Sequence, residues 1–340
     1  MGERRSDLAR SAVMSTSARD LDAAARTDPA LLDPDLRAAF EGCRLLHAEH
    51  GKTYYLATLL LPPAKRPYVW ALYGFARYAD EFVDSLTSPD PQALVEWSDA
   101  FLASLDGDGR GLPDLPGAGG PADPVGRAMA ATMRRWDIPR AHVEAFLHSM
   151  RMDIATTGYA TYEDLREYVY GSAAVIGLQM LPVLETVAPG AEGPARALGE
   201  AFQLSNFIRD VGEDLDRGRV YLPQEDLDAF GVTREDLLRG RAAGTTPQAV
   251  RDLLAFEVAR TRELYAQAVP GLDMVHPTSR DCLWTAYALY GGILDAVEAV
   301  DHDVLARRVA VGMPRRLAVA LPGLGRARLA RWRESRWTTA

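Results

Sequence analysis

Two pairs of aspartates, each spaced four residues apart, could bind a metal ion. Asp80 and Asp84 stand in the stretch ARYADEFVDS, and Asp210 and Asp214 stand in NFIRDVGED. Residues four apart lie on one face of a helix, so the two carboxylates of a pair repel each other, by roughly 0.2–0.5 kcal/mol on an exposed helix. A single pair of this kind is typical of a solvated helix surface. Two pairs, each among aromatic and aliphatic residues, favour a bound cation.

Oxygen-bearing side chains extend the second pair along its helix face. Gln203 and Asn206 precede Asp210 at close to one-turn intervals. Oxygen ligands in an incomplete set suit Mg²⁺, which completes its octahedron with water and phosphate oxygens. Zinc is not expected, because the six histidines are scattered and form no cluster with cysteine. Arg77 and Arg209, beside the two pairs, could bind a diphosphate bridged by such metal ions.

The segments that carry these residues are predicted to be helices. Apolar residues recur at positions i, i+3, i+4 and i+7 through residues 68–84 and 198–215. The same period is found at 121–136, 139–155, 161–185, 246–269 and 279–300, and no set of alternating strands is evident. The Gly/Pro-rich loops at 106–124 and 240–247 are not flanked by a change in composition. The sequence therefore predicts one all-α domain, a helical bundle.

Composition excludes several classes of protein. The chain has 340 residues and a net charge of −9, which argues against nucleic acid as a partner. Two cysteines are too few for a disulfide framework, and the start resembles no secretory signal, so we expect a cytoplasmic protein. The longest apolar run, at 171–184, is too short to span a bilayer. No transmembrane helix is therefore expected.

Three longer stretches resemble the squalene/phytoene synthase family, and bacterial phytoene synthases in particular. They are TYYLATLLLPPAKRPYVWALYGFARYADEFVD, SMRMDIATTGYATYEDLREYVYGSAAVIGLQMLPVL and LGEAFQLSNFIRDVGEDLDRGRVYLP, and the resemblance extends from about residue 40 to about residue 310. It implies the all-α isoprenoid synthase fold with a central cavity. Two Asp-rich helices at the mouth would bind Mg²⁺, or Mn²⁺ in its place, and prenyl diphosphates.

The resemblance also implies roles for individual residues. It assigns metal coordination to Asp80, Asp84, Asn206, Asp210 and Asp214. It assigns catalytic roles, around the reacting diphosphate, to Arg77, Tyr73, Arg209 and Tyr221. It assigns substrate binding to Tyr168, Ser172, Ala173 and Gly177, which would border the prenyl pocket, to Gln203 beside the metal ligands, and to Thr53 as a contact of the diphosphate.

Three further positions have two readings each. Gly171 and Ala174 could border the pocket or serve only to let helices pack closely. Asp153, in the shared stretch MRMD, could act at the site or in a helix cap or ion pair.

The activity implied is head-to-head condensation of two geranylgeranyl diphosphates, through a cyclopropyl (prephytoene) diphosphate, to phytoene in carotenoid biosynthesis, without NADPH. One alternative is squalene or dehydrosqualene synthesis from farnesyl diphosphate. Another is prenyl transfer to an aromatic, carbazole-type acceptor, which a reshaped cavity could favour, because Trp284 stands where relatives often have Arg. A helical interaction protein with decayed motifs is the non-enzymatic alternative, and the complete acidic set argues against it. Oligomeric state and prenyl chain length are not indicated.

The two ends of the chain differ from the domain between them. Residues 1–33 are predicted to form a polar, disordered extension, residues 34–312 the isoprenoid synthase domain, and residues 313–340 a basic tail. Residues 311–340 contain seven arginines and one glutamate, together with Trp332 and Trp337. If helical, this tail would suit the anionic headgroups of a membrane, at the inner face, and otherwise it would be a solvated tail.

Overall fold

The computed structural model describes residues 17–84, 89–106 and 123–337, and the regular structure within these ranges is helical. An isolated antiparallel bridge joins Thr186 to Val275. The prediction of an all-α chain is confirmed. Besides a helical stretch at residues 17–25, the elements are η1 (Pro29–Leu32), α2 (Pro34–His50), α3 (Lys52–Thr58), η2 (Pro63–Lys65), α4 (Arg66–Asp84), α5 (Pro91–Ser104), α6 (Pro124–Trp136), α7 (Arg140–Met152), α8 (Tyr162–Val169), η3 (Tyr170–Ala174), α9 (Val175–Leu184), α10 (Glu192–Asp216), α11 (Gln224–Ala229), α12 (Arg234–Ala243), α13 (Gln248–Ala268), η4 (Val269–Asp273), α14 (Pro277–Glu298) and α15 (Met313–Trp337).

Local sequence signals explain where several helices begin. Asp33, Asp90 and Asp123 each accept a backbone hydrogen bond at a helix start, and each is followed by proline at the first helical position. Thr161 and Thr233 open α8 and α12 with capping boxes. These caps fix the N-terminal ends of the helices.

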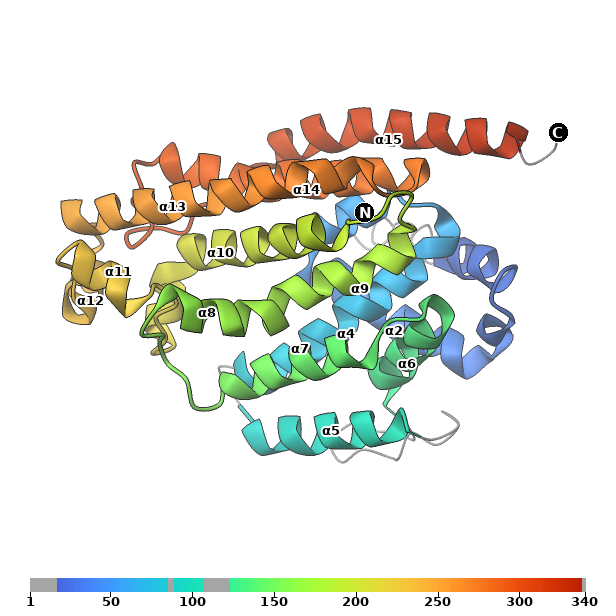
Figure 1. Ribbon diagram of the computed structural model, residues 1–340, viewed down its shortest axis with the longest axis horizontal. Coiled ribbons are helices and arrows are strands. Elements are labelled where there is room, and N and C mark those ends of the chain that lie inside the picture. Colours follow the sequence, from blue (N-terminus) through green and yellow to red (C-terminus); the bar gives the residue numbers. More distant parts are fainter. Residues whose placement is uncertain (1–16, 85–88, 107–122, 338–340) are drawn as a thin grey trace, which may run out of the picture.

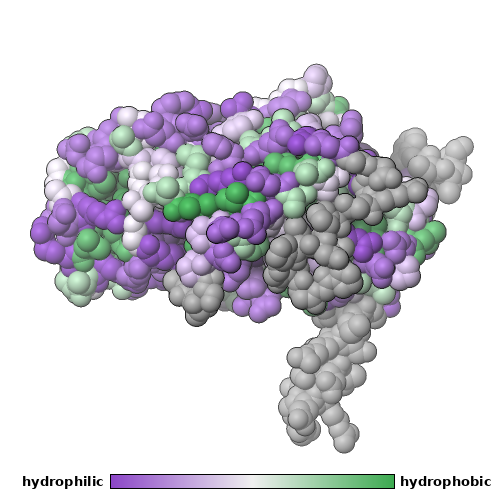
Figure 2. All heavy atoms as spheres, turned by 90° about the horizontal axis from the view of Figure 1, so that it is seen from below, coloured by the Kyte–Doolittle hydropathy of each residue, from purple (hydrophilic) through white to green (hydrophobic). Residues whose placement is uncertain are grey.

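The helices that carry the acidic motifs lie in the middle of the bundle (Figure 1). α10 packs against α13, α14 and α9, and α4 packs against α2, α6 and α9. Figure 1 shows α15 as the outer layer on one side and α5 on the opposite side. The face seen in Figure 2 is mainly hydrophilic, with hydrophobic residues in small separate patches.

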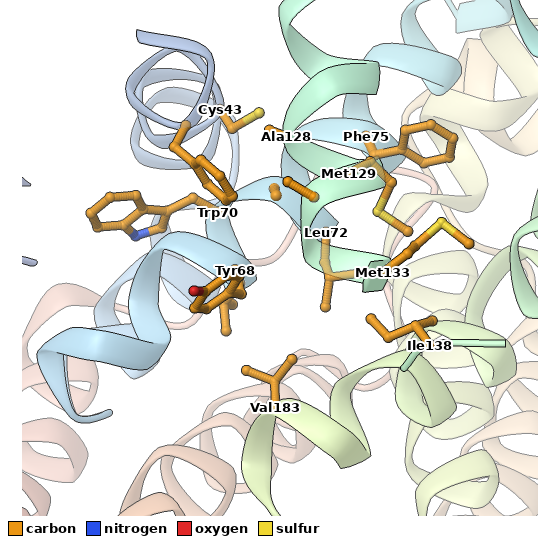
Figure 3. Close-up of a cluster of buried hydrophobic side chains, with 14 of the residues drawn as sticks. Cys43, Tyr68, Trp70, Leu72, Phe75, Ala128, Met129, Met133, Ile138 and Val183 are labelled. Atoms are coloured by element: carbon orange, nitrogen blue, oxygen red, sulfur yellow. The ribbon is translucent and has the colours of Figure 1, made fainter. Parts of the chain in front are cut away.

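A hydrophobic core anchors α4 against its neighbours. Cys43 of α2, Leu72 of α4, Met133 of α6 and Val183 of α9 meet in one buried cluster (Figure 3). Fully burying an aliphatic side chain stabilises a fold by about 1.5–3 kcal/mol. This packing holds α4 rigidly, and with it the first acidic motif.

The described part of the predicted N-terminal extension packs against the core. Leu21, Ala24 and Leu31 are buried in the same cluster as α4. Asp20 accepts hydrogen bonds from Arg66, at 3.0 and 3.1 Å. Residues 17–33 therefore differ from the expected disordered segment, because their few apolar residues recur at helical spacing. Residues 1–16 lie outside the described residues.

The basic C-terminal segment is helical as far as Trp337. α15 packs along α14, where Arg326 pairs with Asp281 at 2.7 Å. Arg331 donates to the backbone carbonyl of Leu60 at 2.8 Å. Among the described helices, none is both long and apolar enough to cross a bilayer.

Candidate active site

An apolar cavity lies between the helices that carry the two acidic motifs. It holds about 290 Å³ and is lined by residues of α2, α3, α4, η3, α9, α10, α13, η4 and α14. Small and aliphatic side chains, such as Ala76, Ala195, Leu198 and Ala286, form most of its wall. An apolar ligand bound here would gain roughly 25 cal/mol for each Å² removed from water. The predicted central cavity is therefore confirmed.

Both acidic motifs lie at the same end of this cavity. Tyr73 and Ala76 of α4 line it, and Asp80 follows Ala76 by four residues, about one helical turn. On α10, Gln203 and Asn206 line the cavity, and Asp210 follows Asn206 by the same interval. Besides burial, Tyr290 and Asp80 raise the pKa of Tyr73, and besides burial Asp210 raises the pKa of Tyr290, so both motifs lie near these two tyrosines. We call this end of the cavity its mouth.

On the α4 side, arginine and carboxylates form a local cluster. Arg77 donates to Asp80 and, from its other terminal nitrogen, to Glu81. Although burial lowers the pKa of Arg77, the two carboxylates raise it above its usual value. The side chain of Asp84 lies outside the described residues. Arg77 thus remains charged beside the carboxylates.

On the α10 side, Asp210 is paired with two arginines. Arg209 donates to it from Nε at 2.8 Å and also from Nη2. Arg308 reaches the same carboxylate from Nε at 3.0 Å and contacts Glu213 at 3.3 Å. Asp214 is buried, with Arg217 3.7 Å away. The carboxylates therefore carry counter-charges that a metal ion could replace.

Arg308 is a site residue that the sequence reasoning missed. Its side chain is 52% exposed and belongs to the segment between α14 and α15. It stands 98 residues from Asp210, so no helical spacing connects the two. The paired arginines Arg307 and Arg308, after the last predicted helix, were the available signal.

Tyr221, Tyr168 and Asp153 form a hydrogen-bonded group behind the mouth. Asp153 accepts a hydrogen bond from Tyr168 at 2.7 Å and another from Tyr221 at 3.3 Å. Tyr221 stacks on Phe207 of α10 with ring centroids 4.0 Å apart. Arg219 donates to the Asp153 carbonyl oxygen at 3.3 Å. This network attaches the segment after α10 to the end of α7.

The residues expected to bind substrate divide into two groups. Ser172, Ala173, Gly177 and Gln203 line the cavity, as does Tyr73. Thr53 and Tyr168 do not belong to its described wall. Tyr168 instead packs in a separate buried cluster with Tyr159 and Phe207.

A π-helical turn, η3, interrupts the wall between α8 and α9. Such turns are rare and are often found at functional sites. The hydroxyl of Ser172, within this turn, is buried without a hydrogen-bond partner among the described residues. A Cβ at Gly171 would lie 2.2 Å from the carbonyl oxygen of Ala145, so close packing against α7 accounts for this glycine.

An aromatic cluster near the mouth contributes the rings of Tyr54 and Phe202 to the cavity wall. Tyr54 stacks on Tyr290, with ring centroids 4.3 Å apart, and Phe202 lies 4.5 Å from Tyr290. Burial raises the pKa of the Tyr54 hydroxyl well above its usual value. These rings remain neutral and offer π faces to a cation.

Trp284 lies away from the cavity. It does not belong to the described wall, and its Nε1 donates to Asp273 at 3.3 Å. Its ring packs edge-on against Tyr287 at 5.7 Å. The position at which this chain differs from its relatives therefore lies outside the described cavity wall.

The donor chemistry at the mouth fits a hard divalent cation. Asp80, Asn206, Asp210 and Asp214 offer only oxygen ligands, which Mg²⁺ prefers. In the part of the chain that the structure describes, no three His, Cys, Asp or Glu residues cluster closely enough to hold a metal by themselves. Mg²⁺ is usually held by one or two carboxylates together with water and substrate phosphate oxygens, so a sparse protein set is suitable.

Comparison with known proteins agrees with this arrangement. A family model described as squalene/phytoene synthase matches residues 47–315. The chain belongs to the squalene/phytoene synthase family. It is 36% identical to the phytoene synthase of Arthrospira platensis over 299 residues, covering 83% of this chain and 92% of that protein. It is 37% identical to the 15-cis-phytoene synthase of Synechocystis over 293 residues, covering 82% of each chain.

Solved structures of family members share the fold. A dehydrosqualene synthase in complex with a ligand superposes with a TM-score of 0.74 at 28% identity, covering 86% of this chain and 98% of that chain. The squalene synthase HpnC from Alicyclobacillus acidocaldarius gives a TM-score of 0.67 at 27% identity, covering 79% and 97%. The fold is thus the all-α isoprenoid synthase fold of a prenyltransferase family.

Proposed function

We propose that this prenyltransferase is a phytoene synthase, which condenses two geranylgeranyl diphosphates head to head, through a cyclopropyl diphosphate, to phytoene in carotenoid biosynthesis. The observation that carries the proposal is the meeting of two acidic helices at the mouth of one apolar cavity. The similarity to phytoene synthases over more than four-fifths of the chain supports the choice of product.

We assign the ligands of a divalent cation, Mg²⁺ or Mn²⁺, to Asp80, Asp84, Asn206, Asp210 and Asp214. A metal ion bound there would stabilise the negative charge that develops on a departing diphosphate. The pairing of arginines with these carboxylates supports the assignment. A metal ion could take the place of a guanidinium group beside a carboxylate, so that the carboxylate keeps a positive partner.

We propose that Arg77, Arg209 and Arg308 balance the remaining negative charge of the leaving diphosphate. Guanidinium groups bind diphosphate oxygens through paired hydrogen bonds. Burial opposes the charge of Arg209, but its hydrogen bonds to Asp210 keep its pKa above the usual value. These arginines would draw the diphosphate to the mouth and leave the prenyl chain inside. Tyr221 would help to hold this end of the site in place through Asp153.

The cavity would protect the carbocation that remains after diphosphate departure. Its apolar wall would exclude water, a competing nucleophile, and the rings of Tyr54, Tyr73 and Phe202 provide electron-rich faces. Ser172, Ala173, Gly177 and Gln203 would border the chain. No hydride donor is required for phytoene, so NADPH has no role in this proposal.

One other activity is favoured by a specific observation. The superposition covers 98% of the solved dehydrosqualene synthase, so the same fold also serves dehydrosqualene synthesis. Dehydrosqualene synthesis from farnesyl diphosphate is therefore the second candidate. Prenyl transfer to an aromatic acceptor is not favoured, because Trp284, the residue expected to reshape the cavity, lies outside the described cavity wall.

Product analysis separates these activities. Purified protein with Mg²⁺ is incubated with the C15 or the C20 diphosphate, with and without NADPH, and with and without an aromatic acceptor such as carbazole. We expect phytoene from the C20 substrate, with no dependence on NADPH. A C30 hydrocarbon as the main product, or a prenylated acceptor without C40 hydrocarbon, would contradict the proposal.

We further propose a cytoplasmic location with peripheral contact at the inner membrane face, through α15. Residues 34–312 would form the catalytic domain on which α15 rests. Met313, Leu317, Leu321, Leu329 and Trp332 are exposed apolar residues of this helix, with Leu321 61% and Trp332 51% exposed. Seven arginines against one glutamate in residues 311–340 complement anionic lipid headgroups. A C40 hydrocarbon is insoluble in water, so a nearby bilayer would receive it.

Charged substitutions on α15 should weaken membrane binding. The double variant L321E/W332E is expected to bind vesicles of phosphatidylglycerol and phosphatidylcholine at least about tenfold more weakly than the wild type, because burial of two apolar side chains is lost. Vesicle sedimentation measures this, with L238E, at an exposed leucine of α12, as the matched control. Equal sedimentation of the double variant and the wild type would remove α15 from the proposal.

A further inference from the structure

A buried histidine on the cavity wall has no hydrogen-bond partner among the residues that the structure describes. His47 of α2 is 0% exposed and lines the cavity. Its Nδ1 and Nε2 are both buried, and within the described residues neither makes a hydrogen bond. Buried polar atoms are satisfied in the great majority of cases, so two free ring nitrogens in one side chain call for a functional explanation.

The His47 ring is held just inside the mouth. It stacks on Tyr73 with centroids 4.2 Å apart and planes 12° apart, and it meets Tyr55 edge-on at 5.4 Å. Tyr73 precedes Asp80 by seven residues, about 10 Å along α4. A Cβ at Gly51 would lie 2.6 Å from Tyr73 and 2.8 Å from His47, so only glycine leaves room for both rings. The ring is therefore fixed on the cavity wall, about two helical turns of α4 from Asp80.

The proposed reaction must dispose of two protons, and this inference rests on that proposed function. Two C20 diphosphates yield a C40 cyclopropyl diphosphate, one diphosphate and one proton. The cyclopropyl diphosphate then yields phytoene, a second diphosphate and a second proton. Each proton needs an acceptor; the carboxylates assigned above would be bound to the metal ion, and the arginines are already protonated.

The other protonatable groups on the wall are poor acceptors. Burial raises the pKa of the Tyr54 and Tyr73 hydroxyls, which stay protonated. Burial raises the pKa of the Cys282 thiol to about 12. Neutral hydroxyl and amide groups are far weaker bases than imidazole. Of the described side chains on the wall, His47 is the one that presents a free nitrogen lone pair.

We propose that His47 accepts the proton lost in the second half of the reaction. The C–H bond of the rearranged C40 cation breaks, its electron pair becomes the central double bond of phytoene, and the proton binds a ring nitrogen of His47. Diphosphate has already departed, so no further leaving group or oxidant is required. The proton passes to water when the product leaves.

The low basicity of this imidazole does not oppose the step. Burial lowers the pKa of His47 to about 3, which makes its protonated form costly in a neutral cavity. During catalysis, however, the cavity already holds the positive charge of the carbocation. Proton transfer moves that charge onto the ring and does not create a new one. A C–H bond beside a carbocation is also far more acidic than an imidazolium.

Substitution of His47 by phenylalanine tests the proposal. H47F keeps a ring against Tyr73 and removes both nitrogens. We expect the kcat for phytoene to fall by about 10²–10⁴-fold, as for other lost general bases. The cyclopropyl diphosphate and C40 alcohols should accumulate in its place, with little change in KM. H47Q should give the same product shift and serves as a second variant if H47F does not fold.

The matched control is H50F, three residues along the same helix at an exposed position outside the described wall. It should leave rate and products unchanged. Phytoene formation by folded H47F at the wild-type rate would overturn the role of His47. Absence of phytoene from the wild-type enzyme would instead contradict the proposed function itself.

Discussion

Replacing Asp210 by asparagine is expected to reduce turnover by about 10³-fold or more, while leaving the fold intact. A metal ion contributes several kcal/mol of charge stabilisation in such sites, and each 1.36 kcal/mol corresponds to a tenfold change in rate. Asparagine retains the size of aspartate but not its charge. It would therefore bind the cation weakly and leave Arg209 and Arg308 without their shared partner. Asp80→Asn should have a comparable effect on the α4 side.

Steady-state formation of the C40 product measures this loss, and thermal unfolding checks the fold. Asp216→Asn is the matched control, because Asp216 ends the same helix and pairs with Arg241 on the exposed surface. Its kcat should stay within about twofold of the wild type, since exposed ion pairs contribute only about 0–1 kcal/mol. Near wild-type kcat in both D80N and D210N would refute the role assigned to the acidic motifs.

A methyl group added at Gly177 should destabilise the protein and disturb the cavity. The Cβ of an alanine there would lie 2.3 Å from the backbone carbonyl oxygen of Ala195. Backbone atoms of α10 can make room only if the helix moves away from α9. Overpacking of this kind costs about 1–3 kcal/mol, and both helices line the cavity. G177A should therefore unfold at lower denaturant concentration and also lose activity.

Gly193 provides the control for this substitution. It lies in the first turn of α10, and a Cβ there would meet no atom within 4 Å. G193A should be neutral or should stabilise the protein by up to about 1 kcal/mol, because alanine favours the helix. Equal free energies of unfolding for G177A and the wild type would show that α9 and α10 can separate without cost.

Local sequence information was sufficient for the helices and for the acidic pairs. The apolar period of 68–84 and 198–215 corresponds to α4 and α10, which extend only a few residues further. The spacing of Asp80 from Ala76, and of Asp210 from Asn206, is a property of one helix and can be read directly from the chain. The meeting of both helices at one cavity required the family resemblance, because helical periodicity does not specify which helices become neighbours.

Features that depend on distant parts of the chain could not be predicted in this way. Arg308 reaches Asp210 across 98 residues, and no local pattern relates them. Tyr168 belongs to an apolar, pocket-like segment, yet its hydroxyl is used by Asp153 behind the wall. His47 looks like one of several scattered histidines until its stacking on Tyr73 is known. Such roles follow from side-chain direction, which only the packed structure provides.

The most direct test of a single site shared by the two acidic helices is a double-mutant cycle on the binding of inorganic diphosphate with Mg²⁺. Isothermal titration calorimetry would compare the wild type, D80N, D210N and the double variant. If both carboxylates hold the same metal–diphosphate cluster, the double variant should bind little more weakly than either single variant, with a coupling energy above about 1 kcal/mol. Losses that add to within about 0.5 kcal/mol would mean that the two motifs act independently, and would contradict a shared site.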